Sequence, residues 1–351
     1  MINFPGILFT NRERITMNKQ QSIPYSILDL APVTRDASFR STLKRSLATA
    51  QYAESTGYTR YWVAEHHNMP NIASSATTIL MGYLAGGTNT IRIGSGGIML
   101  PNHSPLIISE QIGTLARLYP GRIDLGLGRA PGTDPVTARA IRPDRQKAVF
   151  HFEDELQELQ NYFRKDQQTE FVHSYPAEGA DVPFWLLGSS TDSAYLAARL
   201  GLPYVFASHF APDQLLESLS IYRDNFIPSE QLHHPYTIAC IQQITAPTDE
   251  EAELLASSLK LSFLGIVTGK REPLQPPLKL NDKSWGLFSS RVNHMLQYAI
   301  IGSTSTTKDL LSDFLAQTKV DEIMVSSMIY DPKKQQRSFQ LFAQIVSSLA
   351  N

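Results

Sequence analysis

Glu65, His66 and His67 follow directly on the apolar run YWVA. A histidine titrates near neutrality, so this trio is suited to acid/base work at cellular pH. A metal site is a second interpretation, and Asp29 and His103 are available as further ligands, but at no diagnostic spacing. Adjacent residues on an extended strand point in opposite directions, so His66 and His67 do not readily bind one metal ion. A third interpretation is a hydrogen-bonded strand end with no chemical role.

Two glycines, Gly96 and Gly97, interrupt an otherwise apolar segment of Ile, Met and Leu. Glycine inside a strand indicates either a bulge or the close approach of a ligand to the backbone. Simple packing at the wall of a sheet explains the same pattern, so both interpretations stay open at this point.

The segment LLGSSTDS passes from an apolar run through Gly188 into a helix that begins with Ser189, Ser190 and Ser193 nearby. The free N–H groups at such a helix start attract an anion, serine hydroxyls add hydrogen bonds, and glycine lets the ligand approach closely. Ordinary N-capping by serine is the alternative. Arg129 leaves another apolar run and offers the planar guanidinium that suits phosphate, unless it forms only a surface salt bridge.

Strand-like and helix-like segments alternate along the chain and bring these residues to strand ends. Such alternation predicts a parallel sheet, and eight units favour a closed (β/α)8 barrel, whose functional residues follow the carboxyl ends of strands. An open doubly wound sheet with a small second domain is the alternative, but no G-x-G-x-x-G follows the first strand. The predicted strands are residues 23–30, 60–65, 91–100, 122–128, 182–188, 203–207, 236–244 and 320–327.

Residues 269–290 interrupt the alternation with Pro and Gly among polar residues. This segment is predicted to be an insertion between the seventh and eighth strands, forming a loop near the barrel mouth. Residues 1–22 are interpreted as a loosely ordered extension, with a natural start at Met17, and residues 23–351 as a single domain.

The composition excludes several classes of function. The formal net charge of the 351-residue chain is -2, without a block of like charge that predicts binding to nucleic acid or an anionic membrane. Cys240 is the only cysteine, so an internal disulfide and a cysteine-based zinc site are both excluded, which fits the reducing cytoplasm. No apolar run has the roughly 18–20 residues that a membrane span requires.

Taken together, AEHHN, IGSGGIMLPNHSP, GRIDLGLGRAPGTDP and SSTDSAYLAARLGLP resemble the luciferase-like monooxygenases, flavin-dependent (β/α)8 barrels related to the bacterial luciferase α chain. The resemblance extends from about residue 23 to the C-terminal helix. It implies that His66 is an acid/base near the flavin and substrate. It also implies that a non-prolyl cis peptide at Gly96–Gly97 supports the flavin ring, and that Arg129, Ser190 and Ser193 contact the FMN phosphate.

Some positions depart from the family pattern. Ser189 replaces an acidic residue, which limits its expected role to the backbone amide, and Gly128 stands where luciferase has a reactive cysteine. The second phosphate-binding arginine has no clear counterpart, with Arg142, Arg145 and Lys147 as candidates. These departures argue against a light-emitting luciferase.

The implied chemistry is that of a two-component, FMN-dependent monooxygenase. Reduced FMN from a separate flavin reductase reacts with O2 to form a C4a-peroxyflavin, which oxidises a small organic substrate. The resemblance also implies a homodimer that pairs through helices flanking the second and third strands. An F420-dependent oxidoreductase that transfers hydride and a non-catalytic flavin-binding paralogue are the alternatives.

Overall fold

Eight parallel strands close into a TIM barrel in the computed structural model, which describes residues 23–165, 171–280 and 286–349. Residues 1–22, including the proposed start at Met17, lie outside the described part. The barrel strands are β1 (Tyr25–Asp29), β2 (Arg60–Val63), β3 (Arg92–Ser95), β5 (Ile123–Gly128), β6 (Phe184–Gly188), β7 (Tyr204–Phe206), β8 (Thr237–Thr245) and β10 (Glu322–Ser326).

The barrel closes through β10, which pairs with β1 on one side and β8 on the other. Ile323 lies opposite Tyr25, and Met324 lies opposite Cys240. Each strand overlaps one of the eight predicted segments, so the predicted (β/α)8 architecture is confirmed and the doubly wound alternative is wrong.

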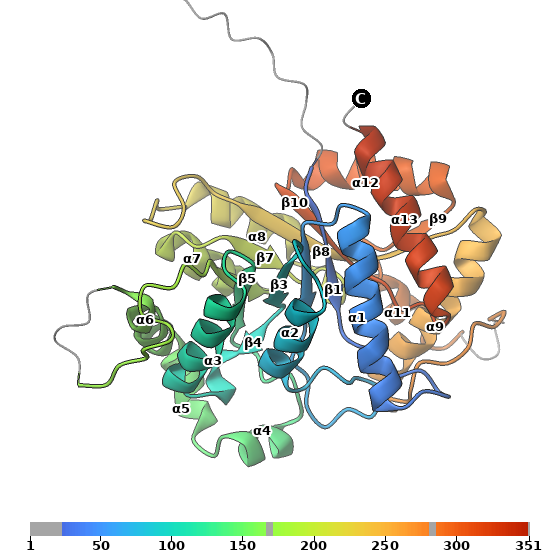
Figure 1. Ribbon diagram of the computed structural model, residues 1–351. Helices are drawn as coiled ribbons and strands as arrows, with labels where there is room; N and C mark the ends of the chain where they lie inside the picture. The colour runs from blue at the N-terminus through green and yellow to red at the C-terminus, as the bar shows by residue number, and fades with distance from the viewer. Residues whose placement is uncertain (1–22, 166–170, 281–285, 350–351) are drawn as a thin grey trace, which may run out of the picture.

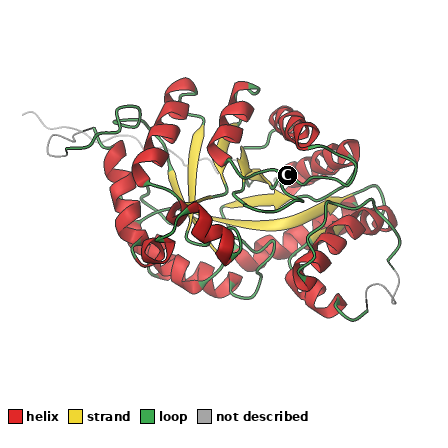
Figure 2. Ribbon diagram, turned by 90° about the horizontal axis from the view of Figure 1, so that it is seen from below, coloured by secondary structure: helices red, strands yellow, loops and turns green. Residues whose placement is uncertain are grey.

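Helices surround the strands, as Figures 1 and 2 show. The strands run toward the bottom of Figure 1, where the loop after β5 carries α4, so Figure 2 looks toward their carboxyl ends. The helices are α1 (Phe39–Ser55), α2 (Thr77–Gly86), α3 (Pro105–Leu118), α4 (Pro135–Ile141), α5 (Arg145–Phe150), α6 (Phe152–Phe163), α7 (Thr191–Leu200), α8 (Leu215–Asp224), α9 (Asp249–Thr268), α11 (Ser289–Met295), α12 (Thr304–Thr318) and α13 (Pro332–Leu349), with a 3-10 turn, η1 (Leu100–Asn102).

The structure corrects the sequence prediction in two places. The third predicted strand is divided at Gly96–Gly97 into β3 and a short strand, β4 (Ile98–Met99), that pairs with β5. Between the predicted insertion, residues 269–290, and the eighth barrel strand there is also a strand that was not predicted, β9 (Ile300–Gly302), which pairs with the end of β8 and lies between the helices α11 and α12. Leu274 of the insertion bridges Thr34 in the loop after β1, so this segment does lie near the barrel mouth.

A buried ion network closes the amino end of the barrel. The Arg60 guanidinium lies 3.0 Å from both Asp124 and Glu322, whose side chains are fully buried. Arg92 makes a second ion pair with Asp124 at 2.6 Å. Trp62 Nε1 donates to Asp124, and Tyr236 and Ser26 donate hydroxyl protons to Glu322. Each buried charge therefore has several partners, as a low-dielectric interior requires.

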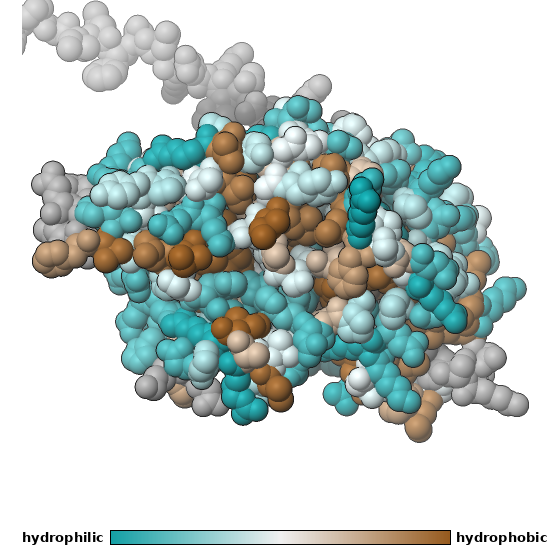
Figure 3. All heavy atoms as spheres, turned by 60° about the horizontal axis from the view of Figure 1, so that its bottom comes forward, coloured by the Kyte–Doolittle hydropathy of each residue, from teal (hydrophilic) through white to brown (hydrophobic). Residues whose placement is uncertain are grey.

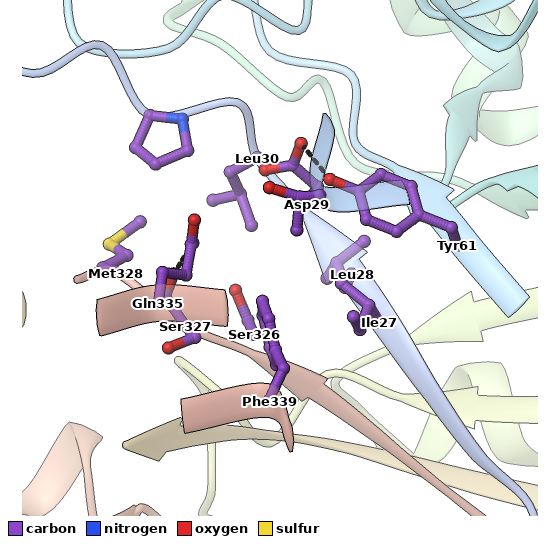
Figure 4. Close-up of a pocket in the computed structure, with 12 residues that line it drawn as sticks. Ile27, Leu28, Asp29, Leu30, Tyr61, Ser326, Ser327, Met328, Gln335 and Phe339 are labelled. Carbon is purple, nitrogen blue, oxygen red and sulfur yellow. Dashed lines mark hydrogen bonds between the residues drawn. The ribbon is translucent and has the colours of Figure 1, made fainter. Parts of the chain in front are cut away.

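Asp29, considered as a metal ligand from the sequence, has a structural role instead. Its carboxylate accepts hydrogen bonds from Tyr61 at 2.7 Å and Ser46 at 2.6 Å, beside a small pocket between β1, β10 and α13 (Figure 4). Burial and the neighbouring Asp29 carboxylate raise the pKa of Tyr61, which therefore stays a protonated donor. Asp29 thus ties β1 to α1 and β2.

The surface carries scattered hydrophobic side chains. One face is shown in Figure 3, where hydrophobic groups alternate with hydrophilic ones. Ile79 and Tyr83 of α2 and Ile107 and Leu118 of α3 are exposed. None of the helices within the described ranges combines the length and the hydrophobicity that crossing a bilayer requires.

Candidate active site

A cavity of about 480 Å³ opens at the carboxyl ends of the barrel strands. Its walls are largely apolar and include Leu28, Met99, Val205, Phe210 and Met324. Polar groups come from the loops that follow β2, β5, β6 and β7. A concave apolar site with few polar groups is typical of a small-molecule or cofactor site, and this end of a TIM barrel is where such sites lie.

Every site residue predicted from the sequence lies on this cavity. The structure brings together segments that are up to 127 positions apart, His66 and Ser193 being the outermost (193 − 66 = 127). The residues are His66, Gly96, Gly97, Arg129, Gly188, Ser189, Ser190 and Ser193.

Glu65 organises the strand end beside the cavity. Its side chain is 1% exposed, and its two oxygens accept from His67, Asn102, His103 and the Met99 backbone N–H at 2.9–3.0 Å. Burial alone would raise the pKa of Glu65, but the hydrogen bonds from the two histidines and Asn102 outweigh it and hold the pKa at about 2. Glu65 is therefore a carboxylate, and it supports the strand end.

His66 lines the cavity and has a hydrogen-bond partner other than the Glu65–His67 pair. Its Nδ1 lies 3.1 Å from the Gly132 carbonyl oxygen. A carbonyl only accepts, so in the neutral ring Nδ1 carries the proton and Nε2 is an acceptor. Burial lowers the pKa of His66 below 6.5, although the Gly132 carbonyl opposes this shift. Gly132 has φ +64, and an added Cβ would lie 2.6 Å from the Glu65 carbonyl oxygen, so only glycine fits this supporting position.

The Gly96–Gly97 peptide bond is cis, as the family resemblance implies. A Cβ on Gly96 would lie 2.5 Å from the Leu28 side chain, and one on Gly97 would lie 2.8 Å from the Gly126 carbonyl oxygen. The absence of side chains therefore leaves a flat stretch of backbone on the cavity wall. A planar ring can approach such a stretch closely.

The start of α7 is left open toward the cavity. Ser190 is its N-cap residue, but its hydroxyl makes no capping hydrogen bond. By contrast, the N-cap side chains of α1, α4, α9 and α12 all accept from the first-turn backbone. The N-cap serine of α3, Ser104, makes no capping hydrogen bond either. The feature that sets α7 apart is that Ser189 and Ser190 at its start line the cavity, where the first N–H groups of the helix suit an anion.

Gly188 and Ser193 fix the geometry of this helix start. A Cβ on Gly188 would lie 1.9 Å from the Ser193 hydroxyl, so glycine is required for the close contact. Ser193 donates its proton to the Ser190 carbonyl at 2.6 Å and also lies 3.0 Å from the Tyr204 hydroxyl. Ser193 therefore positions the turn, and Ser189 and Ser190 line the cavity beside it.

The basic side chains considered as phosphate ligands, Arg129 and Arg142, have different partners. Arg129 lies on the cavity, with a half-exposed side chain 3.5 Å from Asp192 in the first turn of α7. Arg142, a candidate second phosphate ligand, is instead bound to Glu155 at 2.7 Å and to the His103 carbonyl at 2.8 Å, so this candidate is wrong. The side chains of Arg145 and Lys147 lie outside the described residues.

Comparison with known proteins identifies the family of this chain. The family model described as "luciferase-like monooxygenase" matches residues 15–310. The chain belongs to the luciferase-like monooxygenase family. A "luciferase-like monooxygenase" of Escherichia coli K12 is 45% identical over 330 residues, which cover 94% of this chain and 98% of the relative. The "N-acetyl-S-alkylcysteine monooxygenase" of Bacillus subtilis is 31% identical over 338 residues, which cover 92% and 98%.

Solved structures share the luciferase-like fold. The crystal structure of apo-MsnO8 has a TM-score of 0.83 and 31% identity, covering 93% of this chain and 98% of its own. The oxygenating constituent of 3,6-diketocamphane monooxygenase in complex with FMN has a TM-score of 0.70 at 18% identity, covering 93% and 98%. An F420-dependent secondary alcohol dehydrogenase has a TM-score of 0.66 at 14% identity, covering 93% and 99%. The last two likenesses show the fold alone.

Sequence reasoning missed two cavity residues of this luciferase-like barrel, His209 and Cys240. Burial raises the pKa of the Cys240 thiol, so it is protonated and apolar in character. His209 lies in the loop after β7, three positions beyond Phe206, and the strand-end rule that singled out His66 applies equally to it. The described residues contain no group of three or more His, Cys, Asp or Glu side chains placed to hold a metal ion.

Proposed function

We propose that this protein is an FMN-dependent monooxygenase that uses reduced FMN and O2 to oxidise a small organic substrate. The single observation that carries the proposal is the cavity at the carboxyl ends of the strands, where the uncapped start of α7 and Arg129 lie together. Helix N–H groups and a guanidinium suit a phosphate monoester, and the side-chain-free backbone at Gly96–Gly97 suits the flavin ring.

Reduced flavin supplies the two electrons of the reaction, so that one oxygen atom of O2 enters the substrate and the other leaves as water. The chain contributes binding, exclusion of water and control of a proton. In this proposal Arg129 and the Ser189–Ser190 backbone hold the phosphate. The apolar wall excludes water. His66 accepts or returns a proton at Nε2, which its neutral state at pH 7 permits.

The proposed substrate is a small organic molecule, since the cavity walls are mostly apolar. The Bacillus subtilis relative is named for N-acetyl-S-alkylcysteines, so thioethers of this kind are the first candidates to assay. Sulfur oxidation requires only transfer of one oxygen atom, which matches the proposed chemistry. A flavin reductase is the proposed transient partner that supplies reduced FMN.

An F420-dependent hydride transfer is the second candidate, because a structural neighbour uses that cofactor in the same fold. The test is to titrate the purified protein with FMN and with F420, and then to measure O2 uptake with reduced FMN and a panel of thioethers. FMN binding together with substrate-dependent O2 uptake supports the monooxygenase. F420 binding without FMN binding would replace it, and FMN binding without turnover on any substrate would favour a non-catalytic paralogue.

We also propose a homodimer formed through α2 and α3. Ile79 is 74% exposed and Leu118 is 63% exposed, and both helices lie side by side on one flank of the barrel (Figure 1). Light scattering should report twice 39.1 kDa for the wild type. Ile79→Arg should give a monomer, whereas Leu254→Arg on the distant helix α9 should not. A wild-type monomer at micromolar concentration would reject the dimer.

A further inference from the structure

His209 is a buried histidine on the cavity wall with an unusual pattern of hydrogen bonding. It lies in the loop that follows β7, three positions after Phe206, and is 9% exposed. Within the described part of the chain, its Nδ1 is fully enclosed and has no hydrogen-bond partner. Nε2 also has no hydrogen-bond partner among the described residues, but unlike Nδ1 it is not fully enclosed.

The position of the ring is well defined. Ser208 donates its hydroxyl proton to the Cys240 carbonyl at 2.7 Å, and the Ala207 backbone N–H donates to the Gly188 carbonyl at 2.9 Å. The imidazole packs edge-to-face on Phe210, with the ring centroids 4.9 Å apart. The segment after β7 is therefore tied to both neighbouring strands, β6 and β8, and holds the ring against the cavity.

The surroundings of the imidazole indicate which of its two nitrogens carries the proton. Burial, and secondarily the nearby His66, lowers the pKa of His209 to about 3, so the ring is neutral at pH 7. Unpaired buried donors are rarer in proteins than unpaired buried acceptors. A proton on Nδ1 would be a buried donor without an acceptor, whereas a proton on Nε2 can bond to whatever occupies the cavity.

We propose that His209 Nε2–H is a hydrogen-bond donor that recognises an acceptor oxygen or nitrogen of the molecule bound in the cavity. His66 offers an acceptor nitrogen to the same cavity, so the two neutral rings have opposite hydrogen-bonding character. The acceptor belongs either to the flavin ring or to the organic substrate, and this identification of the bound molecules rests on the proposed function.

The test compares His209→Leu, which has no donor, with His209→Gln, which keeps a neutral donor. Without ligand, His209→Leu should melt at or above the wild-type temperature, because it removes an unpaired buried polar group. His103→Leu is the matched control. It removes the 2.9 Å hydrogen bond to Glu65 and should lower the melting temperature.

Ligand binding then identifies the acceptor. If the donor reaches the flavin, His209→Leu should weaken binding of FMN, measured by flavin fluorescence, about 5- to 100-fold. If it reaches the substrate, the affinity for FMN should stay unchanged while KM rises by a similar factor. In either case His209→Gln should recover most of the loss. Should the wild type bind F420 in place of FMN, the same titrations are made with F420.

Two results would overturn the proposal. One is a His209→Leu protein that melts several degrees below the wild type while its flavin affinity and KM are unchanged, which would make His209 a packing residue. The other is a His209→Gln protein as impaired in binding as His209→Leu. Failure of the wild type to bind any flavin would reject the proposed function. The ligand-free melting comparison would then decide on His209, where a destabilised His209→Leu contradicts the proposal and an equal or stabilised one supports it.

Discussion

The two ends of the barrel are built from the same strands, but the charged groups of the amino end are paired with one another, whereas several polar groups of the carboxyl end lie on a cavity. Trp185 Nε1 is an exception at the amino end, since it has no hydrogen-bond partner among the described residues. At the amino end, Arg60, Asp124 and Glu322 are buried and bonded to one another, with hydroxyl and indole donors filling the remaining sites. At the carboxyl end, His209 has no hydrogen-bond partner among the described residues, Nε2 being the ring nitrogen that is not fully enclosed, and the Ser190 hydroxyl makes no capping hydrogen bond to α7. The amino end also has bulky side chains such as Trp62 and Trp185, whereas the carboxyl end has glycines and a cavity.

The difference indicates how the hydrogen bonding of a buried polar group is related to its role. A polar group that is satisfied within the protein stabilises or specifies the fold, since breaking such a network leaves an uncompensated charge. A polar group left unsatisfied beside a cavity costs free energy in the empty protein and is expected to recover that cost when a ligand binds. Substitutions at the amino end should therefore change stability, and those at the carboxyl end should change binding and turnover.

The largest expected effect is on turnover at the carboxyl end. His66→Ala should lower kcat by about 10²–10⁴-fold, the usual contribution of a general acid or base, and should leave most FMN affinity intact. His67→Ala is the control. It removes a hydrogen bond to Glu65 and should cost more stability and less turnover than His66→Ala.

The pH dependence of activity gives a second test of His66. Since burial lowers the pKa of His66 and the neutral ring is the base, wild-type activity should fall only as the pH drops below 6.5, and this decline should be absent from the residual activity of His66→Ala. Stopped-flow and steady-state rates measure both effects. Equal kcat in wild type and His66→Ala would show that His66 takes no part in catalysis and only forms hydrogen bonds at the strand end.

The next effect in size is on stability at the amino end. Glu322→Ala leaves Arg60 with one of its two buried partners missing and should destabilise the fold by about 3–5 kcal/mol. Tyr236→Phe removes one hydrogen bond, of 2.9 Å, to the same carboxylate and should cost about 1 kcal/mol. Urea unfolding measures both. An altered FMN affinity in folded Tyr236→Phe would contradict the division of roles, in which the amino end affects stability and the carboxyl end affects binding.

A third effect concerns Glu65, which lies beside the cavity but is fully satisfied. Its pKa of about 2 lies below the usual value of 4.5, so its charge stabilises the fold above pH 4.5, and this contribution is lost as the pH falls toward 2. At pH 7 the contribution is about 3 kcal/mol, and Glu65→Gln should remove much of it. Urea unfolding at several pH values should show the two proteins converging in acid. A stability difference that stays constant from pH 7 to pH 3 would contradict this role.

The sequence predicted the arrangement of the site because strand order and strand ends follow from local patterns. Alternation of strands and helices indicated the barrel, and the parallel strands then had to bring the segments at residues 65–67, 96–97 and 188–193 to one end. The alternation of side chains along an extended chain also fits the different hydrogen-bond partners of His66 and His67, which are Gly132 and Glu65.

Other features depended on contacts between distant segments. Arg142 is occupied by Glu155, a pairing that no local pattern reveals. Likewise, Glu65 takes a hydrogen bond from His103, 38 positions away. β9 has three residues and pairs only with the extended end of β8, so its own sequence carried little signal. The unpaired nitrogen of His209 is a property of its surroundings, visible only once the surrounding side chains are in place.

The most direct test of the central claim is the ratio of FMN to riboflavin affinity, since riboflavin lacks the phosphate. Wild-type protein should bind FMN more tightly than riboflavin, and Arg129→Ala should weaken FMN by about 1.5–3 kcal/mol, as expected for a charge-assisted hydrogen bond, without weakening riboflavin. Fluorescence titration of both flavins with both proteins measures the four affinities. Equal wild-type affinity for the two flavins, or equal loss for both in Arg129→Ala, would contradict a phosphate site at the start of α7.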